Sequence, residues 1–442
     1  MSTKKKILFV HRWLGIISGL LVIFVAVTGS MLAFEDEGRD YLEHDYYHIA
    51  NPAGAATPVG AATPVGAANP AGAATPATAK ETPARLSLDQ MVDTFRSYNP
   101  KIKINSIRFK EKADAAVVFF TKDKYVFINP YTSRITATVP VKSDFFYVVK
   151  LLHTSLMLGD VGKAIVHINV LLFFTICLSG LVMWWPRKWN LFRSAVSIKT
   201  SGSRKRVNYD LHRALGFYAL PVLLIISFTG LFMASDITKN FVSFITRSPM
   251  PKKDEDAITV TKPASAAGAT GAGAIDAKAT GAGATGAARA GHRHFSLDSA
   301  YAYARTHYPG AQETFVVPAT KETPIRIAMR YPYTIVRNQN TLYFNPWDGS
   351  LVKAELYADY NGYDKMARSN YNLHTGKIGP LGIFSKILWC LMALIAASLP
   401  VTGFCIWMGK RKKKKKDQVM EKSFHLQALH RVGSGSTNSL NA

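Results

Sequence analysis

The stretch His11-Arg12-Trp13-Leu14-Gly15 opens a long apolar segment that reaches Thr28-Gly29, and this arrangement occurs twice. The second copy, His212-Arg213-Ala214-Leu215-Gly216, reaches Thr229-Gly230 at the same offset, again inside an apolar segment. An ionisable side chain inside a membrane span is costly and marks a functional site by default. Because the same costly residue recurs at the same offset, a duplicated helix that carries a histidine organises the chain.

The spacing within each copy places the histidine and the glycine on one helix face. Eighteen residues separate His11 from Gly29, which is about five turns and roughly 27 Å along the helix. The residues four and seven positions after each histidine on that face are small: Gly15 and Ser18 in the first copy, Gly216 and Ala219 in the second. We interpret these small residues as space in which a flat, bulky group approaches the backbone.

Four apolar runs stand out against an average that resembles a soluble protein. The 442 residues are 48% hydrophobic, with a mean hydropathy of +0.04. Each run is nevertheless long enough to cross a hydrocarbon core at 1.5 Å per residue. We therefore expect four transmembrane helices, over residues 7–34, 165–185, 211–235 and 382–408.

The net charge of +25 comes from basic residues that flank these runs. They lie in three places: before the first run, in the loop 187–208 between the second and third runs, and in the tail 409–442. The loop 187–208 contains no acidic residue. By the positive-inside rule both termini and the 187–208 loop are cytoplasmic. Residues 36–150 and 236–375 then lie outside, periplasmic in an inner-membrane protein. The charge pattern favours a lipid partner over nucleic acid.

The three cysteines exclude some classes of site. Cys177, Cys390 and Cys405 all fall inside the expected spans. The chain therefore has no disulfide framework and no c-type haem attachment motif.

The two outer segments repeat a small α+β pattern. Each has a near-repetitive insert, residues 52–79 and 264–291, which is too poor in large apolar groups to fold and is predicted to be disordered. Outside the inserts, Ser87 and Ser296 each precede a helix pattern of about eleven residues. Period-two strand patterns and an Asn-Pro turn follow, with strands expected at 102–109, 115–121, 124–128, 314–317, 325–331 and 341–344. The whole chain thus looks like a tandem duplication.

The even-numbered spans also repeat. His153 and His374 lie shortly before the second and fourth spans, each preceded by Leu and followed by Thr, while Gly180 and Gly403 lie near the far ends of those spans. We interpret the tryptophans at the ends of these spans, Trp184-Trp185 and Trp407, as interfacial anchors.

These repeats sort four histidines into two layers. His11 and His212 begin spans on the cytoplasmic side, and His153 and His374 lie on the outer side. If the halves pack about a pseudo-two-fold axis, each layer brings two imidazoles together, which is the arrangement needed for axial ligation of a haem iron. Each helix would supply a ligand at one level and a small residue at the other.

Two assignments stay open at this point. His167, in the second span, is an alternative to His153 as the outer ligand, although the fourth span has no corresponding histidine. Arg12 and Arg213 suit either haem propionates or lipid headgroups. A zinc site is less favoured, because the histidines are spread over separate helices and not clustered with carboxylates.

These motifs resemble the PepSY-associated transmembrane proteins, a family that includes periplasmic ferric-siderophore reductases. The resemblance is carried by the two His-Arg-x-Leu-Gly stretches, the two Leu-His pairs, Trp184-Trp185-Pro186-Arg187 and the two Asn-Pro-containing units, and covers nearly the whole chain. It implies four transmembrane helices in two tandem repeats, each with a small extracytoplasmic α+β PepSY-like domain. It also implies two b-type haems that pass electrons outward to ferric iron in a siderophore. The two inserts and His167 depart from the family pattern.

Other roles remain possible from the sequence. The chain has no evident nucleotide-binding or flavin motif, so the electron donor would be a cytoplasmic partner or a quinone. Alternatively, the helices anchor outer domains that bind or inhibit a periplasmic peptidase, or the protein transports the chelate.

Overall fold

The computed structural model describes residues 2–42, 44–49, 85–186, 188–251, 258–260, 295–320 and 322–435. The segments 52–79 and 264–291, which were predicted to be disordered, lie outside the described residues.

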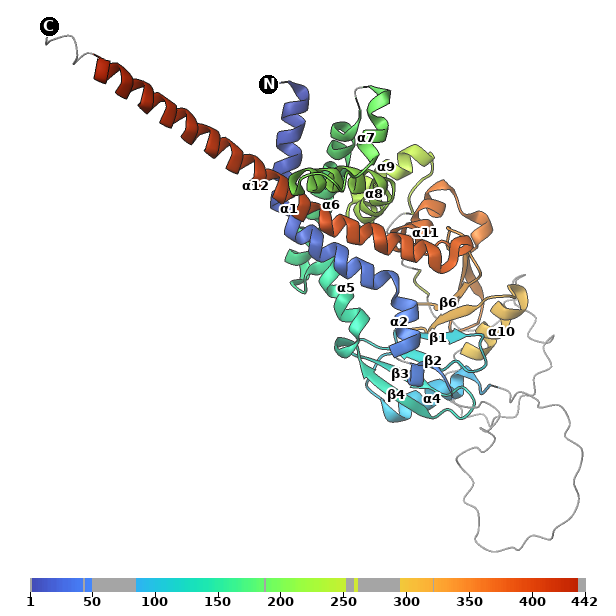
Figure 1. Ribbon diagram of the computed structural model, residues 1–442. Coiled ribbons are helices and arrows are strands. Elements are labelled where there is room, and N and C mark those ends of the chain that lie inside the picture. The colour runs from blue at the N-terminus through green and yellow to red at the C-terminus, as the bar shows by residue number, and fades with distance from the viewer. Residues whose placement is uncertain are drawn as a thin grey trace, which may run out of the picture.

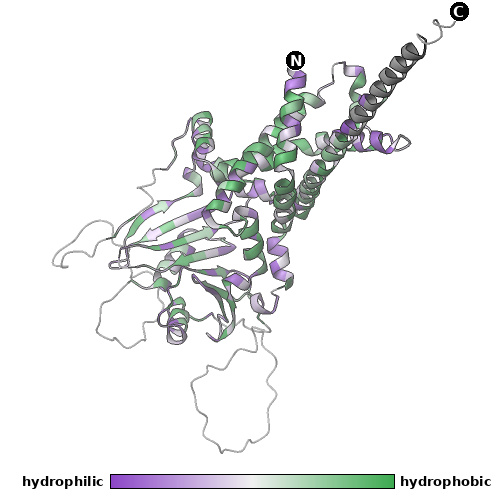
Figure 2. Ribbon diagram, turned by 90° about the vertical axis from the view of Figure 1, so that its left-hand side faces the viewer, coloured by the Kyte–Doolittle hydropathy of each residue, from purple (hydrophilic) through white to green (hydrophobic). Residues whose placement is uncertain are grey.

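A bundle of four long helices forms one part of the molecule and a β-sheet forms the other (Figure 1). The bundle helices are α1 (Thr3–Ala33), α6 (Gly159–Trp184), α8 (Arg204–Ala234) and α12 (Gly382–Gly435). All four are long and apolar enough to cross a membrane, and Figure 2 shows them largely in hydrophobic colour. In Figure 1 both chain termini lie at one end of the bundle, here called the termini side, and the sheet lies beyond the other end, the sheet side.

The helices extend beyond the runs expected from hydropathy. α6 begins at Gly159, six residues before the expected span, and α12 continues past Met408 through the basic tail. Lys and Arg are good helix formers, so the tail has no local reason to stop the helix.

Short helices lie in the connections. They are α2 (Glu35–Leu42), α3 (His44–Tyr47), α5 (Phe145–Ser155), α7 (Phe192–Val196), α9 (Asp236–Thr246) and α11 (Gly362–Thr375), with 3₁₀ turns at Val141–Ser143, Trp189–Leu191, Tyr357–Asp359 and Gly379–Leu381. Of these helices, α7 joins α6 to α8 on the termini side, and the others lie between the bundle and the sheet or follow a bundle helix (Figure 1). The sequence patterns did not predict α5 and α11. These two helices carry His153 and His374, and a left-handed residue ends each one, Leu156 and Gly376 respectively.

The eight strands form one antiparallel sheet, whereas two separate small units were expected. The order is β4-β3-β2-β1-β5-β6-β7-β8. The strands are β1 (Ser106–Lys110), β2 (Val117–Phe120), β3 (Lys124–Ile128), β4 (Ile135–Pro140), β5 (Glu313–Val317), β6 (Ile325–Arg330), β7 (Gln339–Phe344) and β8 (Leu351–Glu355). The outermost strands, β4 and β8, were not predicted. β1 pairs with β5, so the two halves of the chain share one sheet.

Both halves also share one hydrophobic core. α4 (Leu88–Tyr98) and α10 (Leu297–His307) pack on the same face of the sheet, against buried residues such as Ile107 and Phe344. Ser87 and Ser296 cap these helices, as expected. The cap regions also bind each other: the Asp298 carboxylate accepts hydrogen bonds from the backbone of Leu88 and Asp89, and Asp89 accepts one from Ser296.

The interpretation of Trp184 as an interfacial anchor was wrong. Its indole is buried and stacks on Phe217, with ring centroids 3.7 Å apart. Its Nε1 donates a hydrogen bond to the carbonyl of Ala195, which follows in α7. The next residue, Trp185, is 62% exposed, so of the two adjacent tryptophans it is the one on the surface.

His48 joins α2 to the connection between β1 and β2. Its Nδ1 lies 2.7 Å from an Asp114 carboxylate oxygen, and its Nε2 lies 3.0 Å from Asp40. The hydrogen bonds to Asp40 and Asp114 raise the pKa of His48, and the hydrogen bond to His48 lowers the pKa of both carboxyls. The ring of His44 stacks on His48 at 4.4 Å. This cluster therefore fixes the sheet to the bundle most firmly when His48 carries a proton.

The stability of the purified protein should depend on pH through His48. A raised pKa in the folded state gives stability that is complete below about pH 6.5, the unfolded value, and is lost as the pH rises through the folded value. We expect His48→Gln to lower the midpoint of thermal unfolding by about 2 °C near pH 6, and by less at pH 8.5. Intrinsic fluorescence in detergent would measure these midpoints.

The control is His307→Gln, because His307 is exposed and, in the part of the chain that the structure describes, its contacts are a hydrogen bond and a ring stack with Tyr303 of the same helix. The difference between this variant and the wild type should not change with pH. A pH-independent difference for His48→Gln would contradict the assignment of a charged His48.

Candidate functional site

The bundle brings the four repeated histidines together as two pairs. His11 of α1 faces His212 of α8, with ring centroids 6.4 Å apart. His153 of α5 faces His374 of α11, at 6.1 Å. The first is called the termini-side pair and the second the sheet-side pair. Each pair takes one imidazole from each half of the chain.

The spacing within each pair fits two imidazoles on opposite sides of one metal ion. A metal–imidazole bond of about 2.0 Å places two such nitrogens about 4 Å apart. Adding about 1.1 Å from each nitrogen to its ring centre gives a centroid distance of about 6.2 Å. Interplanar angles of 88° and 64° are compatible with this, because rotating one ring about the axis through both nitrogens leaves the distance unchanged.

Hydrogen bonds occupy Nδ1 of every one of these histidines. His153 Nδ1 lies 3.0 Å from the Val25 carbonyl and 3.1 Å from the Thr28 hydroxyl, both on α1. His374 Nδ1 repeats this with Ile226 and Thr229 on α8. Since a carbonyl only accepts, Nδ1 carries the hydrogen, which leaves Nε2 as the unprotonated nitrogen in neutral imidazole.

The termini-side pair follows the same rule. His11 Nδ1 lies 2.9 Å from the Ser179 hydroxyl of α6, and this hydroxyl donates to the Ile176 carbonyl. His212 Nδ1 lies 2.9 Å from the Thr402 hydroxyl of α12. Donation from the second ring nitrogen to a carbonyl or hydroxyl is the usual support of a metal-bound histidine, because it fixes both tautomer and orientation.

The repeated glycines have a different role from the one expected. A Cβ added to Gly29 would lie 2.9 Å from Cε1 of His153, and one added to Gly403 would lie 3.2 Å from Cε1 of His212. Gly180 and Gly230 approach His11 and His374 in the same way. The glycines therefore make room for the imidazoles of their own half, and not for the face of a flat group.

Gly15 is different, because it still faces open space near the termini-side pair. A Cβ at Gly15 would meet no atom within 4 Å. Close by in sequence, Arg12 Nε is buried and lacks a hydrogen-bond partner among the described residues. A haem with a propionate at Arg12 fits both observations, so the residues present suit the group that the sequence predicts.

His167 does not join either pair. It is exposed on α6 and makes no ring contact with His153 or His374 in the part of the chain that the structure describes. Of the two candidates for the outer ligand, His153 is therefore the one that meets His374.

Sequence reasoning missed the hydroxyl partners Ser179 and Thr402. The signal for them was present: each of the four glycines directly follows a Ser or Thr, as in Thr28-Gly29 and Ser179-Gly180. The glycine accommodates the imidazole and the preceding hydroxyl reaches its Nδ1.

The chain was compared with protein families and with curated proteins. None of the curated proteins matches it. The family described as the PepSY-associated TM region matches residues 8–410, nearly the whole chain, and this agrees with the resemblance seen in the motifs. The chain is therefore a member of the PepSY-associated TM region family of membrane proteins.

Proposed function

We propose that this protein is a di-haem reductase of the bacterial inner membrane that passes electrons outward to ferric iron held by a siderophore. The observation that supports it most strongly is the presence of two cross-half histidine pairs at the spacing of axial ligands, with ring centroids 6.4 and 6.1 Å apart. In this proposal the termini side is cytoplasmic and the sheet side is periplasmic, in line with the basic residues beside the termini.

The chain's own residues would hold and orient the cofactors. The Nε2 atoms of His11 and His212 would bind one iron, and those of His153 and His374 the other. Hydrogen bonds to Nδ1 fix each ring and increase its basicity as a ligand, and Arg12 would pair with a propionate. When bound, two b-type haems supply one-electron transfer at two depths of the bilayer.

The depth of the two pairs suits transfer across the membrane. Along α1, His11 lies in the termini-side pair and Gly29 contacts the sheet-side pair. These eighteen residues span roughly 27 Å, close to the thickness of about 30 Å of a hydrocarbon core. Apolar helices around both pairs exclude water from the path.

The reaction itself asks little of the protein beyond electron delivery. Adding one electron to chelated Fe(III) gives Fe(II), which binds hard oxygen donors far less tightly, so the metal is released. No acid, base or nucleophile is required. A cytoplasmic protein or a quinone would supply the electron.

An anchor for peptidase-binding domains and a chelate transporter are the rival roles. Neither requires partly buried imidazoles to meet in pairs inside an apolar bundle, where polar groups are costly. Both roles predict a protein without haem.

Loss of single histidines should remove single haems. The purified wild type should show a sharp b-type α-band in the reduced-minus-oxidised spectrum and two haems per chain. His11→Ala and His374→Ala should each retain one haem, because each breaks one pair and leaves the other intact. Haem extraction and a protein assay would give this ratio.

His167→Ala is the matched control, because His167 is exposed and unpaired with the other histidines in the described structure. This variant should keep two haems. A colourless wild type, or two haems in His11→Ala, would contradict the proposal.

The glycine contacts make a second prediction. A side chain at Gly403 would push His212 from its position, whereas a Cβ at Gly409 in the same helix meets no atom within 4 Å. Gly403→Val should therefore lose one haem, and its spectrum should resemble that of His212→Ala. Gly409→Val should keep both haems. Equal haem content in the two variants would show that the glycine contact is not needed.

A further inference from the structure

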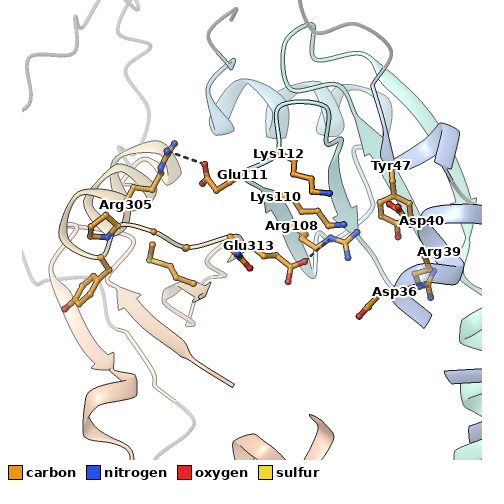
Figure 3. A pocket seen from close by; sticks show the side chains of 16 residues that line it. Asp36, Arg39, Asp40, Tyr47, Arg108, Lys110, Glu111, Lys112, Arg305 and Glu313 are labelled. Atoms are coloured by element: carbon orange, nitrogen blue, oxygen red, sulfur yellow. Dashed lines mark hydrogen bonds and ion pairs between the residues drawn. The ribbon is translucent and has the colours of Figure 1, made fainter. Parts of the chain in front are cut away.

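A cavity of about 650 Å³ lies where α2 approaches the seam between β1 and β5 (Figure 3). Its lining includes Asp36, Arg39, Arg108, Lys110, Glu111 and Glu313. Both halves of the chain contribute to it. Its volume falls within the range of small-molecule sites in proteins.

Cations on and around the lining already pair with three of its carboxylates. Asp36 lies 2.7 Å from Lys377. Glu111 pairs with Arg305, and Glu313 pairs with Arg330 at 3.0 Å. The acids therefore have little capacity left to attract a metal cation or a basic ligand.

Two cations on β1 are held less closely by acids, and both lie over the Tyr47 ring. In the described structure no acid lies within 4 Å of the Lys110 ammonium, which sits 5.5 Å from the centre of the Tyr47 ring. Arg108 Nη2 is buried without a hydrogen-bond partner among the described residues, and the nearest acid to its Nε is Glu313 at 3.7 Å. On β1, the donors left for a ligand therefore belong to Arg108 and Lys110.

The strand geometry forces these two cations together. Arg108 and Lys110 are two positions apart on β1, so they project from the same face of the sheet. This is the face opposite the shared core, and Figure 3 shows both side chains extending toward α2. Burial and the nearby Arg108 charge lower the pKa of Lys110. A negatively charged ligand would remove this repulsion.

The cavity is connected to the sheet-side pair. Asp36 of the lining holds Lys377, which follows His374 by three residues. Asp36 itself belongs to the first half of the chain and lies seven residues after Gly29, which contacts His153. The cavity therefore lies next to the end of the bundle at which, in the proposed function, electrons leave.

We propose that this cavity is the docking site of the reductase substrate and that it selects ferric chelates with a net negative charge. This inference rests on the proposed function. Arg108 and Lys110 would bind carboxylate or catecholate oxygens of the chelate through charge-assisted hydrogen bonds. A neutral chelate of similar size gains none of this attraction.

Gallium complexes test the docking site independently of electron transfer, because Ga(III) resembles Fe(III) in charge and size but is not reduced. The full chain in detergent would be dialysed against anionic gallium dicitrate or neutral gallium tris-acetohydroxamate, and bound gallium would be measured by mass spectrometry. We expect dicitrate to bind at least tenfold more tightly. The difference should shrink with added salt, which screens the attraction.

Charge-removing variants locate the site. Lys110→Gln and Arg108→Gln should each weaken dicitrate binding about tenfold while retaining two haems, which shows that the protein is folded. Lys122→Gln is the matched control, because Lys122 is exposed in the turn between β2 and β3, at the other end of the hairpin. It should bind as the wild type does.

Equal binding of the two complexes, or equal loss in Lys110→Gln and Lys122→Gln, would overturn the proposal. So would retention of phosphatidylglycerol without any dicitrate, which would make the cavity a lipid-headgroup site. The two proposals fail separately. If the protein holds two haems but does not bind gallium complexes by charge, the docking site is wrong and the reductase stands. If a haem-free protein binds them by charge, the reductase is wrong and the docking site stands.

Discussion

The contact between imidazoles of opposite halves is the constraint on which the rest of the structure depends. A histidine inside an apolar bundle must satisfy two ring nitrogens, and here the partner for Nδ1 comes from another helix of the same half. The other ring nitrogen, Nε2, remains available on the side of the histidine from the other half. Each Ser/Thr-Gly pair serves one of the four rings: the hydroxyl contacts Nδ1 and the glycine makes room for the imidazole. The duplication supplies this arrangement twice in each half. α1 and α12 also approach closely in this bundle: a Cβ added to Gly19 would lie 3.0 Å from the Cβ of Pro400.

Much of this arrangement could be predicted from the sequence because it repeats. Four apolar runs indicated four spans, the repeated histidines indicated two layers, and Ser87 and Ser296 marked the starts of α4 and α10. Periodicity and caps are local signals, and the chain shows them twice. The family match over residues 8–410 confirms the resemblance drawn from those motifs.

What the sequence did not reveal depends on contacts between distant segments. The pairing of β1 with β5 joins residues such as Arg108 and Phe315, and no local pattern specifies such a partner. The edge strands β4 and β8 alternate between half-buried and exposed residues, which gave too weak a hydrophobic pattern. Gly29 and Gly403 were assigned to the right levels, but their neighbour is an imidazole of the same half. The buried stack of Trp184 on Phe217 likewise depends on a neighbouring helix.

The single sheet has a mechanical consequence for the sheet-side pair. His153 and His374 belong to α5 and α11, which follow β4 and β8 after 3₁₀ turns and lead into α6 and α12, so each lies between an outer edge of the sheet and a long helix. The continuous ladder of strands ties these edges to each other at a fixed separation. The sheet therefore sets the distance between the two helices that carry the sheet-side imidazoles. A change in the twist of the sheet would move both rings relative to each other.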